Sequence, residues 1–145
     1  MKGKKQRTMN AYKHIVQYYE TDKMGITHHS NYIRWMEEAR IDFLRQIGWD
    51  YARLESDGII SPVVEASCRY KKSTTFEDEI FITVAVKEYK GFKLVLAYEM
   101  KDAEGKTVAT AESEHCFVDK GGKLIRLSKE FPEFDKALGD LISEE

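Results

Sequence analysis

Residues 18–40 read YYETDKMGITHHSNYIRWMEEAR, and this stretch joins a polar loop to the clearest helix of the chain. From residue 32 onward, apolar side chains recur at helical spacing, at Tyr32, Met36, Ala39, Phe43 and Ile47. Ser30 or Asn31 can cap this helix, and Gly48 can end it. These five side chains form an apolar stripe along one face of the helix. Three further apolar residues lie outside this stripe and predict a helix that is covered on more than one side; they are Ile33, Ile41 and Leu44.

The segments around this helix have the composition and alternation of strands. Residues 12–20 are rich in β-branched and aromatic types and predict a strand before it. After a short helix at about 50–56, period-two alternation predicts strands through 64–70, 80–86, 92–100 and 106–118. Short turns between the later strands imply antiparallel pairing. Residues 129–143 predict a terminal helix.

The order of these elements predicts an α+β fold, with one long helix against one large sheet. The 145 residues are expected to form a single domain, 1–145. Apolar side chains remain on the outer face of the predicted sheet, at Phe81, Val95 and Ala97. We therefore expect one sheet face to pair with a second subunit.

Composition excludes several classes of protein. The chain has 23 basic and 25 acidic residues, and a net charge of −2 disfavours a dedicated nucleic-acid binder. No apolar run approaches the ~18–20 residues that span a bilayer. The basic start lacks the apolar segment of a secretory signal, so the expected compartment is the cytoplasm. Cys68 and Cys116 have no CxxC spacing and are expected to be buried small hydrophobes.

The loop before the helix carries the residues best suited to chemistry. Asp22 follows a predicted strand, and Gly25 allows the backbone to turn tightly. The helix that starts after His29 offers unpaired N–H groups and the positive end of its dipole. Such groups can hold a carbonyl oxygen as negative charge develops on it, while a carboxylate attacks the carbonyl or activates water. A cap and a turn is the alternative interpretation of the same residues.

The pattern Tyr19-x-x-Asp22-x-x-Gly25-x-x-x-His29-x-x-Tyr32-x-x-Trp35-x-Glu37-x-Ala39-Arg40 resembles the signature of hot-dog-fold acyl-CoA thioesterases. The branch it resembles contains 4-hydroxybenzoyl-CoA thioesterase and the Tol-Pal-associated acyl-CoA thioesterases. The likeness covers about residues 10–120, with 121–145 as a terminal extension. It implies a hot-dog fold, in which a long central helix is wrapped by an antiparallel sheet of about five strands. It also implies an acyl-CoA substrate, no metal or other cofactor, and a homodimer or homotetramer with active sites at the subunit interface.

The same resemblance assigns roles to single residues. Asp22 matches the catalytic carboxylate, and the backbone N–H of His29 matches the group that polarises the thioester carbonyl. Gly25, His28 and Tyr32 are assigned to substrate binding. The branch commonly has an aromatic residue where this chain has His28, which puts the substrate in doubt more than the chemistry. Whether Asp22 attacks directly or activates water stays open, as does a catalytic or structural role for the His29 ring.

Other polar residues have simpler interpretations. Glu37 and Glu38 are expected to pair along the helix with Arg34, Arg40 or Arg45. Glu65 is expected to face an interface or solvent and receives no catalytic role. Lysines at strand ends and one turn could meet the phosphates of coenzyme A, although each alone is better explained as protecting an edge strand; they are Lys71, Lys72, Lys87, Lys90 and Lys93. The histidines lack metal-ligand spacing, and no nucleotide-binding glycine motif is present.

The predicted function is hydrolysis of an acyl-CoA thioester to a carboxylic acid and coenzyme A. Three alternatives remain: an acyl-carrier-protein substrate, a hot-dog dehydratase, and a non-enzymatic protein that binds an acyl ligand. Activity on both carriers would separate the first from the prediction. No dehydratase motif is found, and a pocket filled by side chains would favour the non-enzymatic protein.

Overall fold

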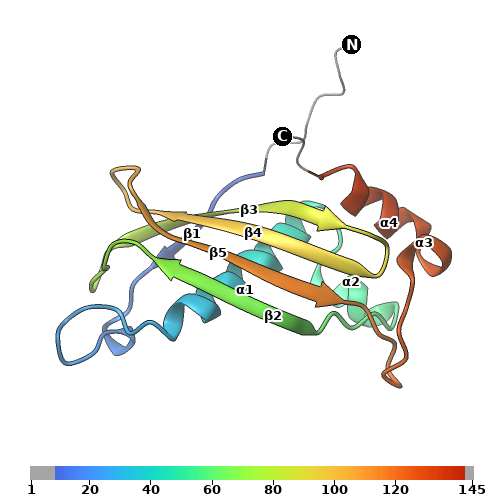
Figure 1. The fold of residues 1–145 in the computed structure, drawn as a ribbon, viewed down its shortest axis with the longest axis horizontal. Coiled ribbons are helices and arrows are strands. Elements are labelled where there is room, and N and C mark those ends of the chain that lie inside the picture. The colour runs from blue at the N-terminus through green and yellow to red at the C-terminus, as the bar shows by residue number, and fades with distance from the viewer. Residues whose placement is uncertain (1–8, 143–145) are drawn as a thin grey trace, which may run out of the picture.

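One antiparallel sheet packs against one long helix in the computed structural model, which describes residues 9–142 (Figure 1). The sheet has five strands in the order β1-β3-β4-β5-β2. The strands are β1 (Tyr12–Ile15), β2 (Val63–Tyr70), β3 (Glu79–Tyr89), β4 (Lys93–Lys101) and β5 (Thr107–Cys116). The helices are the 3₁₀ helix η1 (Tyr18–Glu20), α1 (Asn31–Gln46), α2 (Tyr51–Ser56), α3 (Leu127–Glu130) and α4 (Pro132–Gly139). This confirms the predicted α+β fold and its central helix.

The core lies between α1 and the inner face of the sheet. Alternate residues of β3 and β4 are buried and meet across the strands, as in the pairs Val84↔Tyr98 and Val86↔Leu96. On β5 the inner positions are smaller, with Ala111 opposite Tyr98 and Ser113 opposite Leu96. Alternation places every second side chain on one face, so these positions form a continuous wall beneath the helix.

Helix α1 buries the stripe that its sequence predicts. Every member of that stripe, together with Trp35 and Leu44, is almost completely removed from solvent. Gly48, at a φ of 87°, allows the chain to leave the helix in a left-handed conformation. Ile33 remains 42% exposed and Ile41 half-buried, so a second covering on this side of the helix is not supplied by residues 9–142.

Two predicted elements are interrupted. The strand expected over 12–20 ends at Ile15, because the backbone turns through η1 and buries the Glu20 carboxylate instead of exposing it. The terminal helix expected over 129–143 is split at Phe131, whose φ of −139° is not helical. Pro132 causes this break, since proline disfavours the helical conformation of the preceding residue.

Strand β2 is one edge of the sheet, and it pairs only with β5 among the described residues. All its residues except Cys68 are exposed, including Val63 (53%), Val64 (58%) and Tyr70 (48%). Cys68 and Cys116 are free and only half-buried, so they are less buried than expected. Of the predicted single domain 1–145, residues 1–8 and 143–145 lie outside the described part.

Candidate active site

Asp22 begins a tight loop between η1 and α1. The amide of Asp22 donates to the carbonyl of Ile26 (2.9 Å), and the amide of Gly25 donates to the carbonyl of Asp22 (2.9 Å). Gly25 has a φ of 82°, a conformation that glycine adopts without strain. One carboxylate oxygen of Asp22 accepts the Met24 amide at 2.8 Å. The loop thus fixes a half-buried carboxylate with one oxygen held by the backbone.

The start of α1 lacks the side-chain cap that the sequence predicted. The hydroxyl of Ser30 lies 2.9 Å from Nδ1 of His28 and makes no cap hydrogen bond to the helix. Asn31 directs its amide to the carbonyls of Glu20 and His28. The backbone N–H of His29 has no acceptor among residues 9–142. A free donor at the positive end of a helix suits a developing oxyanion.

A buried polar network supports this loop from below. The Glu20 carboxylate is 2.9 Å from Nε2 of His14 and accepts the Gln17 amide at 2.9 Å and the Trp35 indole at 3.0 Å. Burial alone would raise the pKa of Glu20, but these hydrogen bonds outweigh burial and hold its pKa below the ordinary value. The carbonyl of Glu20 also accepts the His28 amide at 2.8 Å, so the network positions the residue next to His29.

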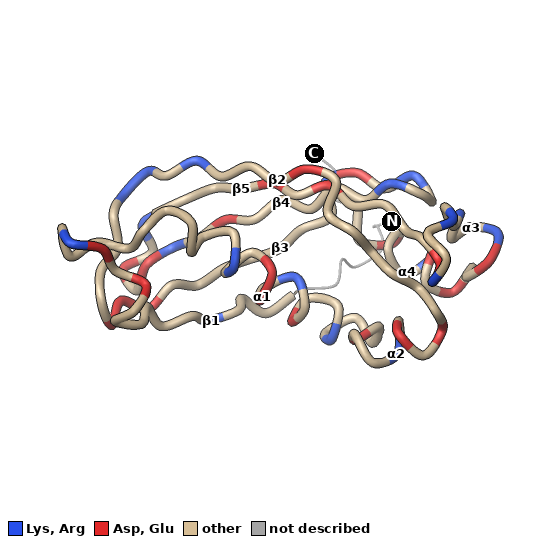
Figure 2. The backbone as a smooth tube through the Cα atoms, turned by 90° about the horizontal axis from the view of Figure 1, so that it is seen from below, with Lys and Arg blue, Asp and Glu red and all other residues tan. Residues whose placement is uncertain are grey.

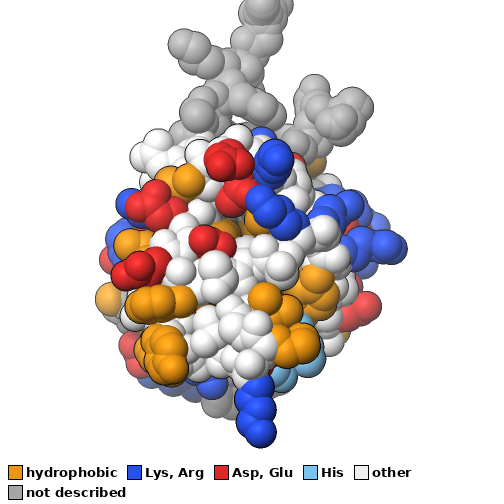
Figure 3. Space-filling model, turned by 90° about the vertical axis from the view of Figure 1, so that its left-hand side faces the viewer, with side chains coloured by type: hydrophobic (Ala, Val, Ile, Leu, Met, Phe, Trp, Pro, Cys, Tyr) orange, Lys and Arg blue, Asp and Glu red, His pale blue; other side chains and the backbone are white. Residues whose placement is uncertain are grey.

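The remaining candidates lie at the same end of the molecule as the loop. His28 and His29 are exposed and stack with ring centroids 4.4 Å apart. Histidine side chains reach the surface there beside hydrophobic ones (Figure 3). Tyr70, at the end of β2, donates to the His29 carbonyl at 3.3 Å. Tyr32 is only 3% exposed, and its hydroxyl is 2.9 Å from Oγ1 of Thr74, so in this chain it supports the helix start from within.

The two helix glutamates differ from the predicted pairing with arginines. Glu38 turns towards β1, where it accepts from the Tyr12 hydroxyl (2.9 Å) and lies 3.0 Å from Nδ1 of His14. The pairing prediction was therefore wrong for Glu38, because the helix packs that face against β1 rather than leaving it in solvent. Glu37 has no hydrogen bond or ion pair among residues 9–142 and borders two cavities instead.

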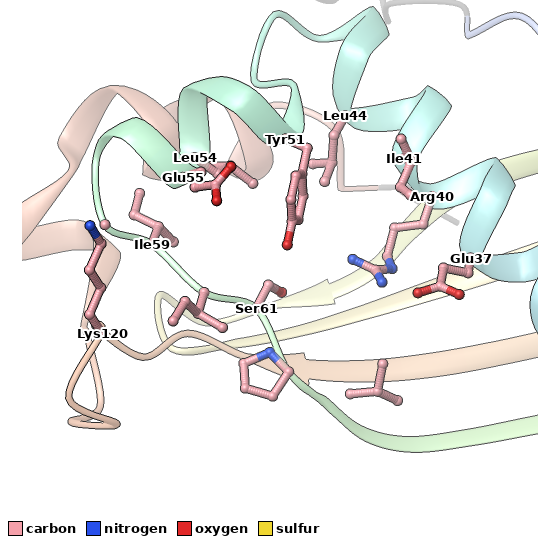
Figure 4. A pocket seen from close by; sticks show the side chains of 14 residues that line it. Glu37, Arg40, Ile41, Leu44, Tyr51, Leu54, Glu55, Ile59, Ser61 and Lys120 are labelled. Carbon is pink, nitrogen blue, oxygen red and sulfur yellow. The ribbon is translucent and has the colours of Figure 1, made fainter.

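The larger cavity, about 560 Å³, lies between α1, α2 and the loop that leads into β2 (Figure 4). Its wall combines apolar side chains such as Leu44 and Leu54 with Arg40 and Tyr51, and Lys120 stands at the far end. A second cavity of about 270 Å³ lies between α1 and the sheet. Both cavities are bordered by Glu37, Arg40 and Val63, so they adjoin.

Sequence reasoning missed a hydrogen-bonded chain in the smaller cavity. The Ser113 hydroxyl lies 2.6 Å from the Tyr98 hydroxyl and 2.7 Å from Nε2 of His115. All three side chains are buried and border this cavity. The available signal was the presence of Ser113 and His115 on the otherwise apolar inner face of β5.

Most of the lysines singled out in the sequence are paired. Lys72 pairs with Asp102 at 2.6 Å, Lys87 pairs with Glu112, and both Lys90 and Lys93 pair with Glu88. Among the described residues, Arg69 and Lys71 have no ion-pair partner. Basic positions gather beyond one end of β2 and β5, at the upper left of Figure 2.

Residues 9–142 contain neither a cluster of metal-binding side chains nor a membrane-spanning helix. No group of three or more His, Cys, Asp or Glu side chains is arranged to hold a metal ion. No helix in this part of the chain is long and apolar enough to cross a membrane.

Comparison with known proteins places this fold and loop in a family. Residues 16–139 match the Thioesterase-like superfamily, and the chain belongs to it. It is 37% identical over 123 residues to "Putative acyl-CoA thioesterase YneP" of Bacillus subtilis, covering 84% of this chain and 89% of that protein. It is 30% identical over 108 residues to the 1,4-dihydroxy-2-naphthoyl-CoA hydrolase of Thermosynechococcus vestitus, covering 74% of each. The solved DHNA-CoA thioesterase of Staphylococcus aureus superposes with a TM-score of 0.85 at 34% identity, covering 90% of this chain and 88% of that one.

Proposed function

We propose that the chain hydrolyses an acyl-CoA thioester, with Asp22 as its reacting carboxylate and the His29 amide as the donor to the thioester carbonyl. The observation that carries the assignment is the free His29 N–H at an uncapped helix start, in the same short loop as Asp22. The family and its acyl-CoA-hydrolysing relatives support the reaction class.

The proposed chemistry needs few groups, because a thioester has a weakly stabilised carbonyl and a good thiolate leaving group. Attack on the carbonyl carbon places negative charge on its oxygen, which the His29 amide stabilises. The C–S bond then breaks, and the coenzyme A thiolate takes up a proton. Two routes are open to the Asp22 carboxylate. As a general base it removes a proton from the water that attacks the thioester carbonyl. As a nucleophile it attacks the thioester carbonyl directly, and water then hydrolyses the resulting anhydride. Both routes consume one water and release a carboxylic acid.

We further propose that the working form is a homodimer joined through β2. An eight-residue edge strand with exposed valines at one end and Tyr70 at the other is prone to pair with another strand. Because Tyr70 contacts His29, a second copy on this edge would lie beside the candidate site. The unpaired Arg69 and Lys71 near the same strand end are proposed contacts for coenzyme A phosphates. The two free cysteines support the cytoplasm as the proposed compartment.

The acyl group is proposed to be aromatic, since two of the relatives described above act on 1,4-dihydroxy-2-naphthoyl-CoA or DHNA-CoA. The test follows thiol release from short, medium, long and aromatic acyl-CoAs with the wild type, Asp22→Asn and Glu37→Gln. We expect Asp22→Asn to lower turnover at least ~10²-fold, the scale of losing a general acid or base. Retained activity in Asp22→Asn with loss in Glu37→Gln would move the reacting carboxylate onto α1. No hydrolysis of any acyl-CoA would contradict the proposed function.

A further inference from the structure

The connection between β2 and β3, residues 71–78, lies against the loop that carries Asp22. Both segments are at the left-hand end of the molecule in Figure 1. An isolated antiparallel bridge between Ile26 and Thr75 joins them. The loop before α1 is therefore supported by a segment about fifty residues further along the chain.

Thr75 makes the contact of this connection that lies nearest to Asp22. Its hydroxyl donates to the carbonyl of Gly25 at 2.7 Å. The amide of Gly25 in turn donates to the carbonyl of Asp22 at 2.9 Å, so one residue links the hydroxyl to the backbone of the proposed reacting group. Glycine restricts its own backbone less than any other residue does. A hydrogen bond from outside the loop thus fixes a peptide unit that the loop sequence leaves free to rotate.

The position of Thr75 is itself determined by the turn that follows it. The Asp78 carboxylate accepts the amide of Thr75 at 2.9 Å, and the amide of Asp78 donates to the carbonyl of Thr75 at 3.0 Å. Val16, directly after β1, bonds to this turn twice, with the carbonyl of Asp78 (3.0 Å) and the amide of Glu77 (2.9 Å). Glu77 has a φ of 74°. Such a strained conformation persists only where the surrounding contacts over-determine it, so the turn is a firm support.

A buried chain of hydroxyl groups forms a second link, on the His29 side of the loop. The hydroxyl of Thr74 lies 2.7 Å from that of Thr27 and 2.9 Å from that of Tyr32, and all three residues are at most 7% exposed. The carbonyl of Thr74 accepts the amide of Thr27 at 2.8 Å and lies 3.2 Å from its hydroxyl. If Tyr32 donates to Thr74 and Thr74 donates to Thr27, each of the three protons has an acceptor. Every hydroxyl of this link is thus satisfied within the protein.

We infer that the β2–β3 connection is a positioning element of the proposed thioesterase site, and that Thr75 holds the Asp22 carboxylate in place through Gly25. Thr74 has the matching role at the other end of the loop. The inference rests on the proposed function and extends it to residues that touch neither the substrate nor the reacting atoms. A misplacement of about 1 Å can cost ~10²-fold in rate. Loss of the Thr75 hydrogen bond is therefore expected to slow turnover although every reacting group is still present.

The test replaces the Thr75 hydroxyl with a methyl group in Thr75→Val and restores a hydroxyl in Thr75→Ser. Because Thr75 is exposed, both variants are expected to fold and to melt within about 4 °C of the wild type. Thiol release is followed with the acyl-CoA of the panel described above that the wild type hydrolyses fastest. The kcat of Thr75→Val is expected to fall about 10-fold at a nearly unchanged KM. Thr75→Ser is expected to recover most of this loss.

Amide hydrogen exchange, resolved by NMR, measures the loop independently of catalysis. The amides of Asp22 and Gly25 are hydrogen-bonded within the loop, and both are expected to exchange at least about 5-fold faster in Thr75→Val. Amides of the central strand β4 are expected to keep their wild-type rates. Thr83→Val is the matched control, because it removes the same hydroxyl from an exposed position on β3. It should match the wild type in kcat and in loop exchange.

An unchanged kcat or an unchanged loop exchange in Thr75→Val, with an active wild type, overturns the inference and leaves the proposed function standing. Equal losses of kcat in Thr75→Val and Thr75→Ser also overturn it, because the serine hydroxyl can make the same hydrogen bond. Thr74→Val tests the buried link, and if this variant fails to fold, Thr75→Val still decides the question. A wild type that hydrolyses no acyl-CoA contradicts the proposed function, and this inference with it.

Discussion

The indole Nε1 of Trp35 donates a hydrogen bond of 3.0 Å to Oε2 of Glu20, which ties the candidate loop to the buried face of α1. The other oxygen of the same carboxylate is 2.9 Å from His14 on β1, and the Glu20 carbonyl holds the amide of His28. Through its side chain and its backbone carbonyl, this one residue therefore joins the edge strand, the central helix and the loop. The position of the His29 amide depends on a carboxylate that is 4% exposed.

Glu20→Ala is expected to lower the free energy of unfolding by about 3 kcal/mol, since each buried donor left without its acceptor costs about 1–3 kcal/mol. The loss leaves the Trp35 indole and the Gln17 amide without their acceptor. Urea-induced unfolding, monitored by tryptophan fluorescence, measures this loss of stability. Glu38→Ala is the control. The Glu38 side chain is 40% exposed, so its removal is expected to lower the free energy of unfolding by less. Equal losses in the two variants would show that burial of Glu20 is not what stabilises the loop.

Gly25 gives a second prediction, about the shape of the loop. Its φ of 82° strains any residue with a Cβ, although a Cβ there would meet no atom within 4 Å. Gly25→Val is expected to lower kcat/KM and melting temperature more than Gly25→Asn, because asparagine tolerates this conformation at a smaller cost. Steady-state kinetics and a thermal melt of both variants measure the difference. If Gly25→Asn and Gly25→Val behave alike, backbone conformation does not set the position of Asp22.

The exposed edge of β2 leads to a prediction about assembly. Val64→Lys places a charge on an exposed apolar position of this edge and is expected to convert the proposed dimer into monomers of lower activity. Sedimentation velocity at micromolar concentration measures the change. Thr83→Lys adds the same charge to an exposed position of β3 and should leave at least a dimer. A wild-type monomer, or an active Val64→Lys monomer, would contradict a site shared across β2.

Local sequence patterns predicted the elements whose periodicity decides their structure. Alternation placed β3, β4 and β5 to within a few residues, and the apolar stripe placed α1. The break at Phe131 was not predicted, although Pro132 is visible in the sequence and disfavours a helical residue before it. The end of β1 at Ile15 could not be predicted from local sequence. It depends on the contacts of Glu20 with His14 and Trp35, and those contacts need the folded helix.

In the candidate site, too, residues close in sequence could be predicted and contacts between distant residues could not. Asp22, Gly25 and His29 lie within eight residues, so a motif could identify them. The two cavities join residues of α1 with residues of β2, and the smaller adds β4 and β5. The partner of Glu38 is also distant in sequence, as it lies on β1. No spacing rule brings such residues together, because their proximity follows from how the helix crosses the sheet.

His115 gives the last prediction, the loss of stability in mild acid. Burial and Arg40 lower its pKa to about 4, while the nearby Pro62 carbonyl opposes the shift. The unfolded chain, with a histidine pKa near 6.5, takes up this proton first as the pH falls. The contribution of neutral His115 to the free energy of unfolding is therefore fully present above pH 6.5. It declines towards pH 4, by about 3 kcal/mol for this one group. Urea unfolding at half-unit pH steps measures the decline.

The control is the same titration in His115→Gln, which has no imidazole to protonate. This variant is expected to start less stable but to lose about 3 kcal/mol less between pH 6.5 and 4. Tyr98 borders the same cavity and keeps its proton over this range, because burial raises its pKa. Glu37→Gln removes the carboxylate of the cavity and separates its contribution. Parallel curves for the wild type and His115→Gln would mean that the folded protein accommodates the imidazolium, and that the buried nitrogen is not held neutral by its surroundings.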